Sequence, residues 1–189
     1  MRNSLVVLLL TILLCSCSST KTAAIKYQPI FDFSALKSYG LYQREHKFSD
    51  WQPLSDGMRN SIELAIEKSM DSQGYLLKDS SQADVVVTYY LVKQNNHTFI
   101  QYNNGVNYCS YCLVHSEKGS RKERLMIYPG SLIIDIVKPK SRRSIWRATY
   151  PLKIKDKDNS LDINTKISSA VDSMLQQLTI MKQAQGKRA

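Results

Sequence analysis

Four side chains that could bind a metal or carry redox chemistry lie close together in the sequence: His97, Cys109, Cys112 and His115. Thiolate and imidazole groups suit zinc or copper, so the set could form a metal site. The two cysteines could also act as a redox pair, but a reactive thiol usually needs a helix N-terminus, and no helical pattern follows Cys112. A structural disulfide between the two cysteines is the third reading, and all three remain open at this point.

Other catalytic motifs do not stand out. The sequence has no Gly-rich phosphate loop, no Gly-x-Ser-x-Gly and no His-Glu-x-x-His. Asp135 lies in an apolar stretch, where a single buried carboxylate more often accepts hydrogen bonds than does chemistry. Tyr89, Tyr90 and Trp146 could line a groove, although core packing is their commoner role in strands. We expect a protein that is not an enzyme and needs no cofactor.

Basic residues dominate the charge of the chain. Its 189 residues include 26 Lys or Arg and 16 Asp or Glu, a net charge of +10. The basic residues are densest in two polar segments. One contains Lys118, Arg121, Lys122 and Arg124, and the other contains Lys138, Lys140, Arg142 and Arg143. Pro139 should stiffen the second segment as a turn between two strands, so its charges would project from one end of a sheet. We predict that this second group binds anions; a solvated basic surface is the alternative.

The N-terminus has the pattern of a secretion signal. Residues 5–14 form an apolar run of about 15 Å as a helix, half of a ~30 Å hydrocarbon core, which suits a signal peptide and not a membrane span. The run ends in Leu14-Cys15-Ser16-Cys17, which resembles the bacterial lipoprotein signal. Leu14 and Ser16 fit the positions before a lipidated Cys17, whereas bulky Leu14 directly before Cys15 fits poorly. We predict lipidation of Cys17.

The lipoprotein signal implies a location and a class of partners. Ser18, and not Asp, follows the cysteine, which predicts the outer membrane and its periplasmic face. The expected partners are the membrane, through the lipid anchor, and an envelope protein or anionic envelope polymer, with no nucleic acid. We expect a signal peptide over 1–16, a lipidated N-terminus and tether over 17–26, one domain over 27–182 and a flexible basic tail over 183–189.

This location bears on the remaining cysteines. With Cys15 removed and Cys17 acylated, Cys109 and Cys112 are the only thiols left, and an oxidising periplasm favours their pairing. A regular strand would hold their Cα atoms about 10 Å apart, whereas a disulfide needs about 4.4–6.8 Å. We predict that Cys109 and Cys112 form a disulfide, so the chain must turn between them.

Hydrophobic periodicity predicts an α+β domain. Apolar positions three and four apart indicate one helix after Ser55 or Asp56, ended by Gly74, and a second from about Asp162 to Lys182. Strands are expected over 33–42, 85–92, 132–137 and 144–153, and a hairpin over 98–115 that turns at Asn104-Gly105. We predict a single antiparallel or mixed sheet with two amphipathic helices on one face.

Several short motifs follow one another along the chain: Phe31-Asp32-Phe33-Ser34, Tyr39-Gly40, Gly74-Tyr75, Ala83-Asp84-Val85-Val86-Val87, Gly130-Ser131-Leu132-Ile133-Ile134-Asp135 and Ile145-Trp146-Arg147-Ala148. In this order they resemble the DUF4136 family of bacterial lipoproteins. The resemblance covers residues 27–178. It supports an envelope location and transfers no catalytic residue. The chain departs from the pattern at Lys138 and by carrying two cysteines between Thr98 and Val114.

The sequence therefore predicts a non-catalytic outer-membrane lipoprotein that acts as a periplasmic binding module. A long polar loop and a basic turn on a compact domain fit this role better than a catalytic one. The alternative is a metal-binding or thiol-redox envelope protein that uses Cys109 and Cys112.

Overall fold

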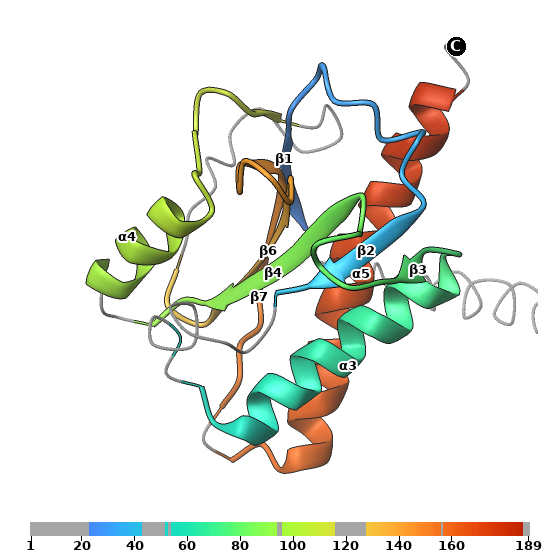
Figure 1. Cartoon of the computed structure of the whole chain (residues 1–189). Helices are drawn as coiled ribbons and strands as arrows, with labels where there is room; N and C mark the ends of the chain where they lie inside the picture. The colour runs from blue at the N-terminus through green and yellow to red at the C-terminus, as the bar shows by residue number, and fades with distance from the viewer. Residues whose placement is uncertain are drawn as a thin grey trace, which may run out of the picture.

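The computed structural model describes residues 23–42, 52, 54–93, 96–115, 128–155 and 157–186. Their elements, in chain order, are β1 (Ala24–Tyr27), β2 (Ser38–Leu41), α3 (Asp56–Ser72), β3 (Leu76–Leu77), β4 (Val85–Leu91), α4 (Asn96–Gly105), β5 (Val114–His115), β6 (Ser131–Val137), β7 (Ser144–Pro151) and α5 (Ser160–Gly186). The strands form one mixed sheet in the order β3-β2-β4-β6-β7-β1-β5 (Figure 1). The α+β class is confirmed.

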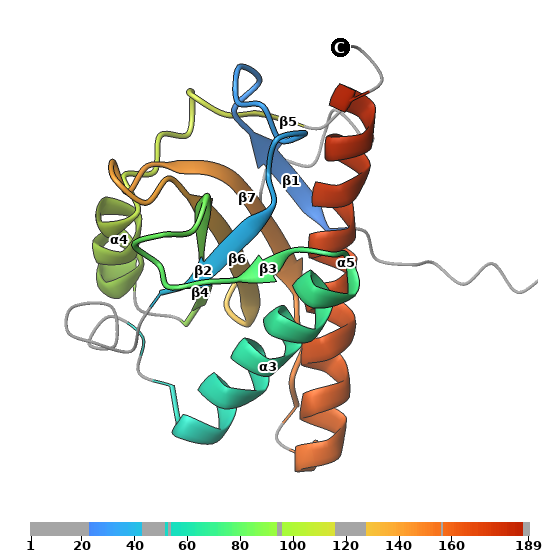
Figure 2. The same cartoon turned by 45° about the vertical axis from the view of Figure 1, so that its right-hand side comes forward.

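Helices α3 and α5 pack side by side on one face of the sheet, as predicted (Figures 1 and 2). Ser55 caps α3 by accepting a hydrogen bond from the Met58 backbone N–H at 3.3 Å. The buried stripe of α5 contains Ile167, Ala170, Val171, Met174, Leu175 and Leu178. The buried faces of α3 and α5 enclose the main core against the inward-facing residues of the strands. No helix among the described residues is long and apolar enough to cross a membrane.

A third helix, α4, covers the opposite face of the sheet, where the sequence predicted a hairpin (Figure 1). Phe99, Tyr102 and Val106 pack there against Tyr90 and other residues of β4 and β6. Their spacing of three and four residues matches one face of a helix, and burying that face outweighs the turn preference of the Asn-Gly pair. The predicted hairpin and the prediction of only two helices were therefore wrong.

The limits of the domain also differ from the prediction. β1 begins at Ala24 and pairs with β7 and β5, so the tether predicted to reach residue 26 is shorter. At the other end, α5 continues to Gly186, so residues 183–186 are helical and not part of a flexible tail. Gln185 explains the longer helix, because its amide accepts from the Phe33 N–H at 2.7 Å and donates to the Phe31 carbonyl at 3.0 Å.

Strand directions bring several loops to one end of the sheet. β4 begins where the antiparallel β6 ends, because Val86 lies opposite Val137. β7 begins where β1 ends, because Trp146 lies opposite Tyr27. The β6–β7 turn, the loop after β1 and the loop before β4 therefore share this end.

Candidate anion-binding cleft

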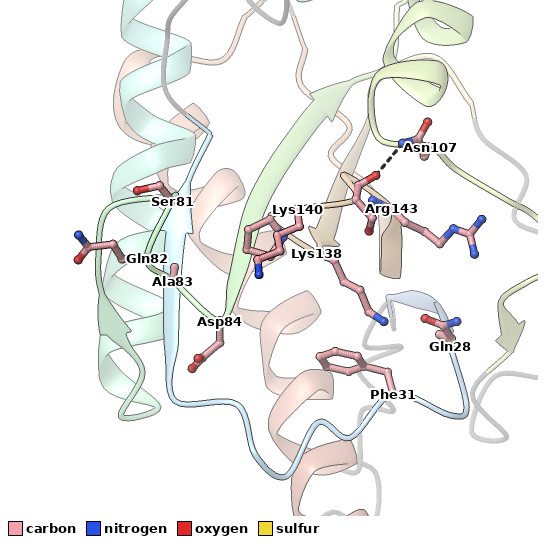
Figure 3. Close-up of a pocket in the computed structure, with 12 residues that line it drawn as sticks. Gln28, Phe31, Ser81, Gln82, Ala83, Asp84, Asn107, Lys138, Lys140 and Arg143 are labelled. Carbon is pink, nitrogen blue, oxygen red and sulfur yellow. Dashed lines mark hydrogen bonds between the residues drawn. The ribbon is translucent and has the colours of Figure 1, made fainter.

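An open cleft of about 940 Å³ lies at this end of the sheet (Figure 3). The β6–β7 turn forms one wall, and the loop before β4 forms another. The loop after β1 and the end of the α4 segment complete the lining. The lining residues are Gln28, Phe31, Ser81, Gln82, Ala83, Asp84, Asn107, Lys138, Pro139, Lys140, Ser141 and Arg143.

The β6–β7 turn is held in one conformation by its own hydrogen bonds. The Lys138 N–H donates to the Arg143 carbonyl at 3.0 Å, and the Arg142 N–H donates to the Lys138 carbonyl at 2.9 Å. Arg142 has a φ of 52°, a left-handed conformation that closes the turn. The Asn107 side chain donates to the Ser141 carbonyl at 2.8 Å and ties the tip of the turn to the α4 segment (Figure 3). The basic side chains therefore project from a fixed backbone.

Three of the four predicted anion-binding residues line the cleft: Lys138, Lys140 and Arg143. Lys138 is half-buried, and its ammonium lies 5.3 Å from the centre of the Phe31 ring, a cation–π distance (Figure 3). Lys140 and Arg143 are exposed. Arg142 is exposed outside the lining, where its charge opposes the rise that burial causes in the pKa of Tyr42.

One carboxylate, Asp84, also lines the cleft, and one of its oxygens, Oδ2, accepts three hydrogen bonds from β2 and the residue before it. It accepts from the Lys37 N–H at 3.0 Å, the Ser38 N–H at 2.8 Å and the Ser38 hydroxyl at 2.9 Å. The hydrogen bond from the Lys37 N–H is the main cause that lowers the pKa of Asp84. This carboxylate fixes the start of β2, and the three cations outnumber it in the lining.

The wall before β4 depends on a glycine in β2. A Cβ on Gly40 would lie 2.6 Å from the Cα of Ser80, so only glycine lets this loop approach the strand. Asp79 shapes the same loop by accepting from the Ser81 N–H at 2.8 Å and the Ser81 hydroxyl at 2.6 Å. These contacts place Ser81 and Gln82 opposite the basic turn.

A buried ion pair lies beneath α4, away from the cleft. The Arg147 guanidinium donates to both oxygens of Asp135, with its Nη2 at 2.9 Å from Oδ2 and its Nε at 2.9 Å from Oδ1. Tyr102 and Ser144 also donate to Asp135, at 2.8 and 2.5 Å. Burial and then Asp135 raise the pKa of Tyr102. Asp135 was expected to accept hydrogen bonds if it faced inward, and its four donor atoms give it that role.

This pair belongs to a polar row that crosses the sheet. Thr88, Asp135, Arg147, Lys26 and His115 stand opposite one another on successive strands from β4 to β5. Burial and the charge of Arg147 lower the pKa of Lys26, and burial and Lys26 lower the pKa of His115. The row ties α4 and the segment after it to the sheet, because Tyr108 also stacks on Arg147 with 3.5 Å between ring centre and Cζ.

The two central cysteines are joined in a tight turn after α4. Cys109 and Cys112 form a disulfide, with 5.2 Å between their Cα atoms, and the Cys112 N–H donates to the Cys109 carbonyl. His97 lies on α4 and His115 on β5, so the hairpin expected to bring His97 to the cysteines is absent. The part of the chain that the structure describes holds no group of three or more His, Cys, Asp or Glu suited to a metal ion.

Three predicted features lie outside the described residues: the signal peptide over 1–16, the lipidation residue Cys17, and the basic segment with Lys118, Arg121, Lys122 and Arg124. Sequence reasoning missed Phe31, Asn107 and the loop before β4 as parts of the cleft. Only Asn107 carried a usable signal, because asparagine tolerates the left-handed φ of 43° that it adopts here.

Comparison with known proteins places this fold in a family. The family model for the domain of unknown function DUF4136 matches residues 23–178. The crystal structure of a DUF4136 family protein from Bacteroides thetaiotaomicron VPI-5482 resembles this structure with a TM-score of 0.51 and 15% sequence identity, over 83% of this chain and 96% of that one. No curated protein matches the chain. The chain belongs to the DUF4136 family.

Proposed function

We propose that the protein is a non-catalytic lipoprotein of the outer membrane, faces the periplasm, and binds an anionic envelope component in the cleft. The observation that carries this proposal is the gathering of Lys138, Lys140 and Arg143 around one open cleft. Two of these cations are exposed and all three stand on a turn with a fixed backbone. Such an arrangement attracts anions over a Debye length of roughly 8–10 Å at moderate salt.

The cleft suits an extended ligand better than a small buried one. Its walls come from separate loops; Ser81 and Gln82 lie across the cleft from the cations, and Gln28 lies beside Lys138 (Figure 3). Phe31 adds an apolar surface to the cleft, and the Lys138 ammonium lies over its ring. A polymer with anionic groups could place one of them at the turn while its neighbouring units contact the polar wall.

A charge-reversal experiment tests this proposal. Lys140→Glu with Arg143→Glu should weaken binding of the purified unlipidated chain (Cys17→Ala) to lipopolysaccharide or to cell-wall sacculi by about tenfold, more at low salt. Lys68→Glu with Lys157→Glu makes the same change in net charge on exposed residues of α3 and of the loop before α5. Equal binding by all three proteins, or none by the parent chain, would contradict the proposal.

The metal-binding or redox alternative stays a separate prediction. Metal binding needs Cys109 and Cys112 as free thiols, and a redox role needs them to cycle between thiols and disulfide. The proposed binding module needs them only as a clip that holds the turn after α4. Alkylation and mass spectrometry of the exported protein should find no free thiol. Reduced cysteines with stoichiometric zinc or copper would favour the alternative.

A further inference from the structure

We propose that the cleft faces away from the membrane that holds the lipid anchor, and that its ligand is an anionic polymer of the cell wall and not the lipid headgroups of that membrane. This inference rests on the proposed function and on lipidation of Cys17. The cell-wall polymer is the anionic surface of the envelope that the cleft can reach while the domain is anchored.

The direction of β1 sets the orientation. Ala24 lies opposite Thr149, near the end of β7, whereas Tyr27 lies opposite Trp146, near its start. The chain therefore enters the sheet at the end where β7 finishes. The cleft lies at the other end, where the β6–β7 turn precedes Ser144.

The length of chain before β1 limits how far the domain can turn over. The six residue steps from Cys17 to Ala23 span at most about 21 Å when fully extended. Along β7, the five steps from Thr149 back to Ser144 already cover about 17 Å, and the β6–β7 turn projects beyond Ser144. The cleft could meet the anchoring membrane only if the whole tether ran back, fully extended, along the side of the sheet.

The charge of the cleft then selects the partner. A surface that faces the periplasm from the outer membrane meets peptidoglycan, whose peptide stems carry free carboxylates. Lys138, Lys140 and Arg143 offer guanidinium and ammonium donors for such groups, and Arg143 can bind a carboxylate through two parallel hydrogen bonds. Phe31 and the polar opposite wall fit the uncharged parts of a glycan strand.

The test uses the full lipidated chain in vesicles of phosphatidylethanolamine and phosphatidylglycerol, mixed with purified peptidoglycan sacculi. The vesicles should sediment with the sacculi, and Lys140→Glu with Arg143→Glu should reduce this capture about tenfold. The variant Lys68→Glu with Lys157→Glu should sediment like the parent chain. In parallel, the free Cys17→Ala chain, which carries no lipid anchor, is tested for binding in two separate assays. One assay uses the sacculi alone, and the other uses empty vesicles of the same lipids.

The outcomes separate the two proposals. If the Cys17→Ala chain binds sacculi through the cleft but the lipidated chain in vesicles does not, the orientation is wrong and the proposed function stands. If the Cys17→Ala chain binds the lipid vesicles through the cleft and not the sacculi, the ligand class proposed here is overturned in favour of headgroups. If it binds neither, and lipopolysaccharide also fails, the proposed function itself falls.

Discussion

Single residues show how much of this fold depends on satisfied polar groups in its interior. Asp135 and Arg147 are fully buried, and each would be costly without the other because a lone charge loses its hydration. Tyr102 brings α4 into the same network through its bond to Asp135. The pair therefore fixes the position of α4 more than it adds net stability.

Removing one partner should reveal this dependence. Asp135→Leu leaves the Arg147 guanidinium buried without a carboxylate, and we expect the free energy of unfolding to fall by about 3–5 kcal/mol. Asp135→Leu with Arg147→Met replaces both charges by apolar groups and should recover most of that loss. Urea denaturation measures both variants, and a single variant as stable as the parent chain would refute the assigned role.

Asp84 gives a prediction about pH at the same scale. Its pKa is lowered in the folded protein, chiefly by the hydrogen bond from the Lys37 N–H, so its contribution to stability is present above the unfolded pKa of about 3.9. That contribution is lost as pH falls through the lower, folded pKa. Asp84→Asn should lower the melting temperature at pH 7, and the difference from the parent chain should shrink below about pH 4. If the difference in melting temperature did not change with pH, the ionised Asp84 carboxylate would not be the source of the stability.

At the scale of elements, the fit of neighbouring segments decides the shape of the cleft. The loop before β4 can form its wall because Gly40 has no side chain where Ser80 passes. Gly57, in the first turn of α3, has nothing within 4 Å of the position of a Cβ. The two glycines therefore form a matched pair for substitution.

Gly40→Ala should destabilise the protein and displace the wall of the cleft. The added methyl group would overlap the backbone of Ser80, at an expected cost of about 1–3 kcal/mol. Gly57→Ala should leave stability unchanged or raise it slightly, because alanine favours a helix. Thermal unfolding of both variants provides the measurement, and equal melting temperatures would show that the close approach has no energetic effect.

The elements also show where sequence reasoning succeeded and failed. α3, α5, β4, β6 and β7 have long apolar patterns, so their type and approximate position followed from periodicity. The helix α4 did not follow from periodicity. The Asn104-Gly105 pair favours a hairpin turn, and the apolar stripe of α4 gains stability only by packing on the sheet beneath it. The pairing of β1 with β7 joins residues more than a hundred positions apart, and no local pattern encodes it.

The candidate site could be predicted only in part from the sequence. The basic turn could be placed at a sheet end, since it lies between two adjacent buried strands. The opposite walls could not, because Phe31, Asn107 and the loop before β4 come together only through the sheet order. Of the four predicted cations, only Arg142, the residue with the left-handed φ in this turn, lies outside the lining.

At the scale of the whole molecule, the proposed lipid anchor would hold the end of the sheet where β1 begins, and the cleft lies at the other end. Cys17→Ala should release the protein from membranes, because the two or three acyl chains proposed on Cys17 would supply the binding at about 0.8 kcal/mol for each buried methylene. Cys15→Ala should have no such effect, since the proposed cleavage of the signal would remove Cys15. Membrane fractionation with fatty-acid labelling measures both, and label that survives in Cys17→Ala would assign the lipid to another residue.

The most direct test of the central claim, that the cleft binds an anionic envelope component, is site-specific photocrosslinking in intact cells. A photoreactive residue at Ser141, in the lining of the cleft, should capture an envelope component, and the capture should fall sharply with Lys140→Glu and Arg143→Glu. The same residue at Leu64, exposed on α3, should not capture it. Equal capture from both positions, or capture at Ser141 that charge reversal leaves unchanged, would contradict the claim.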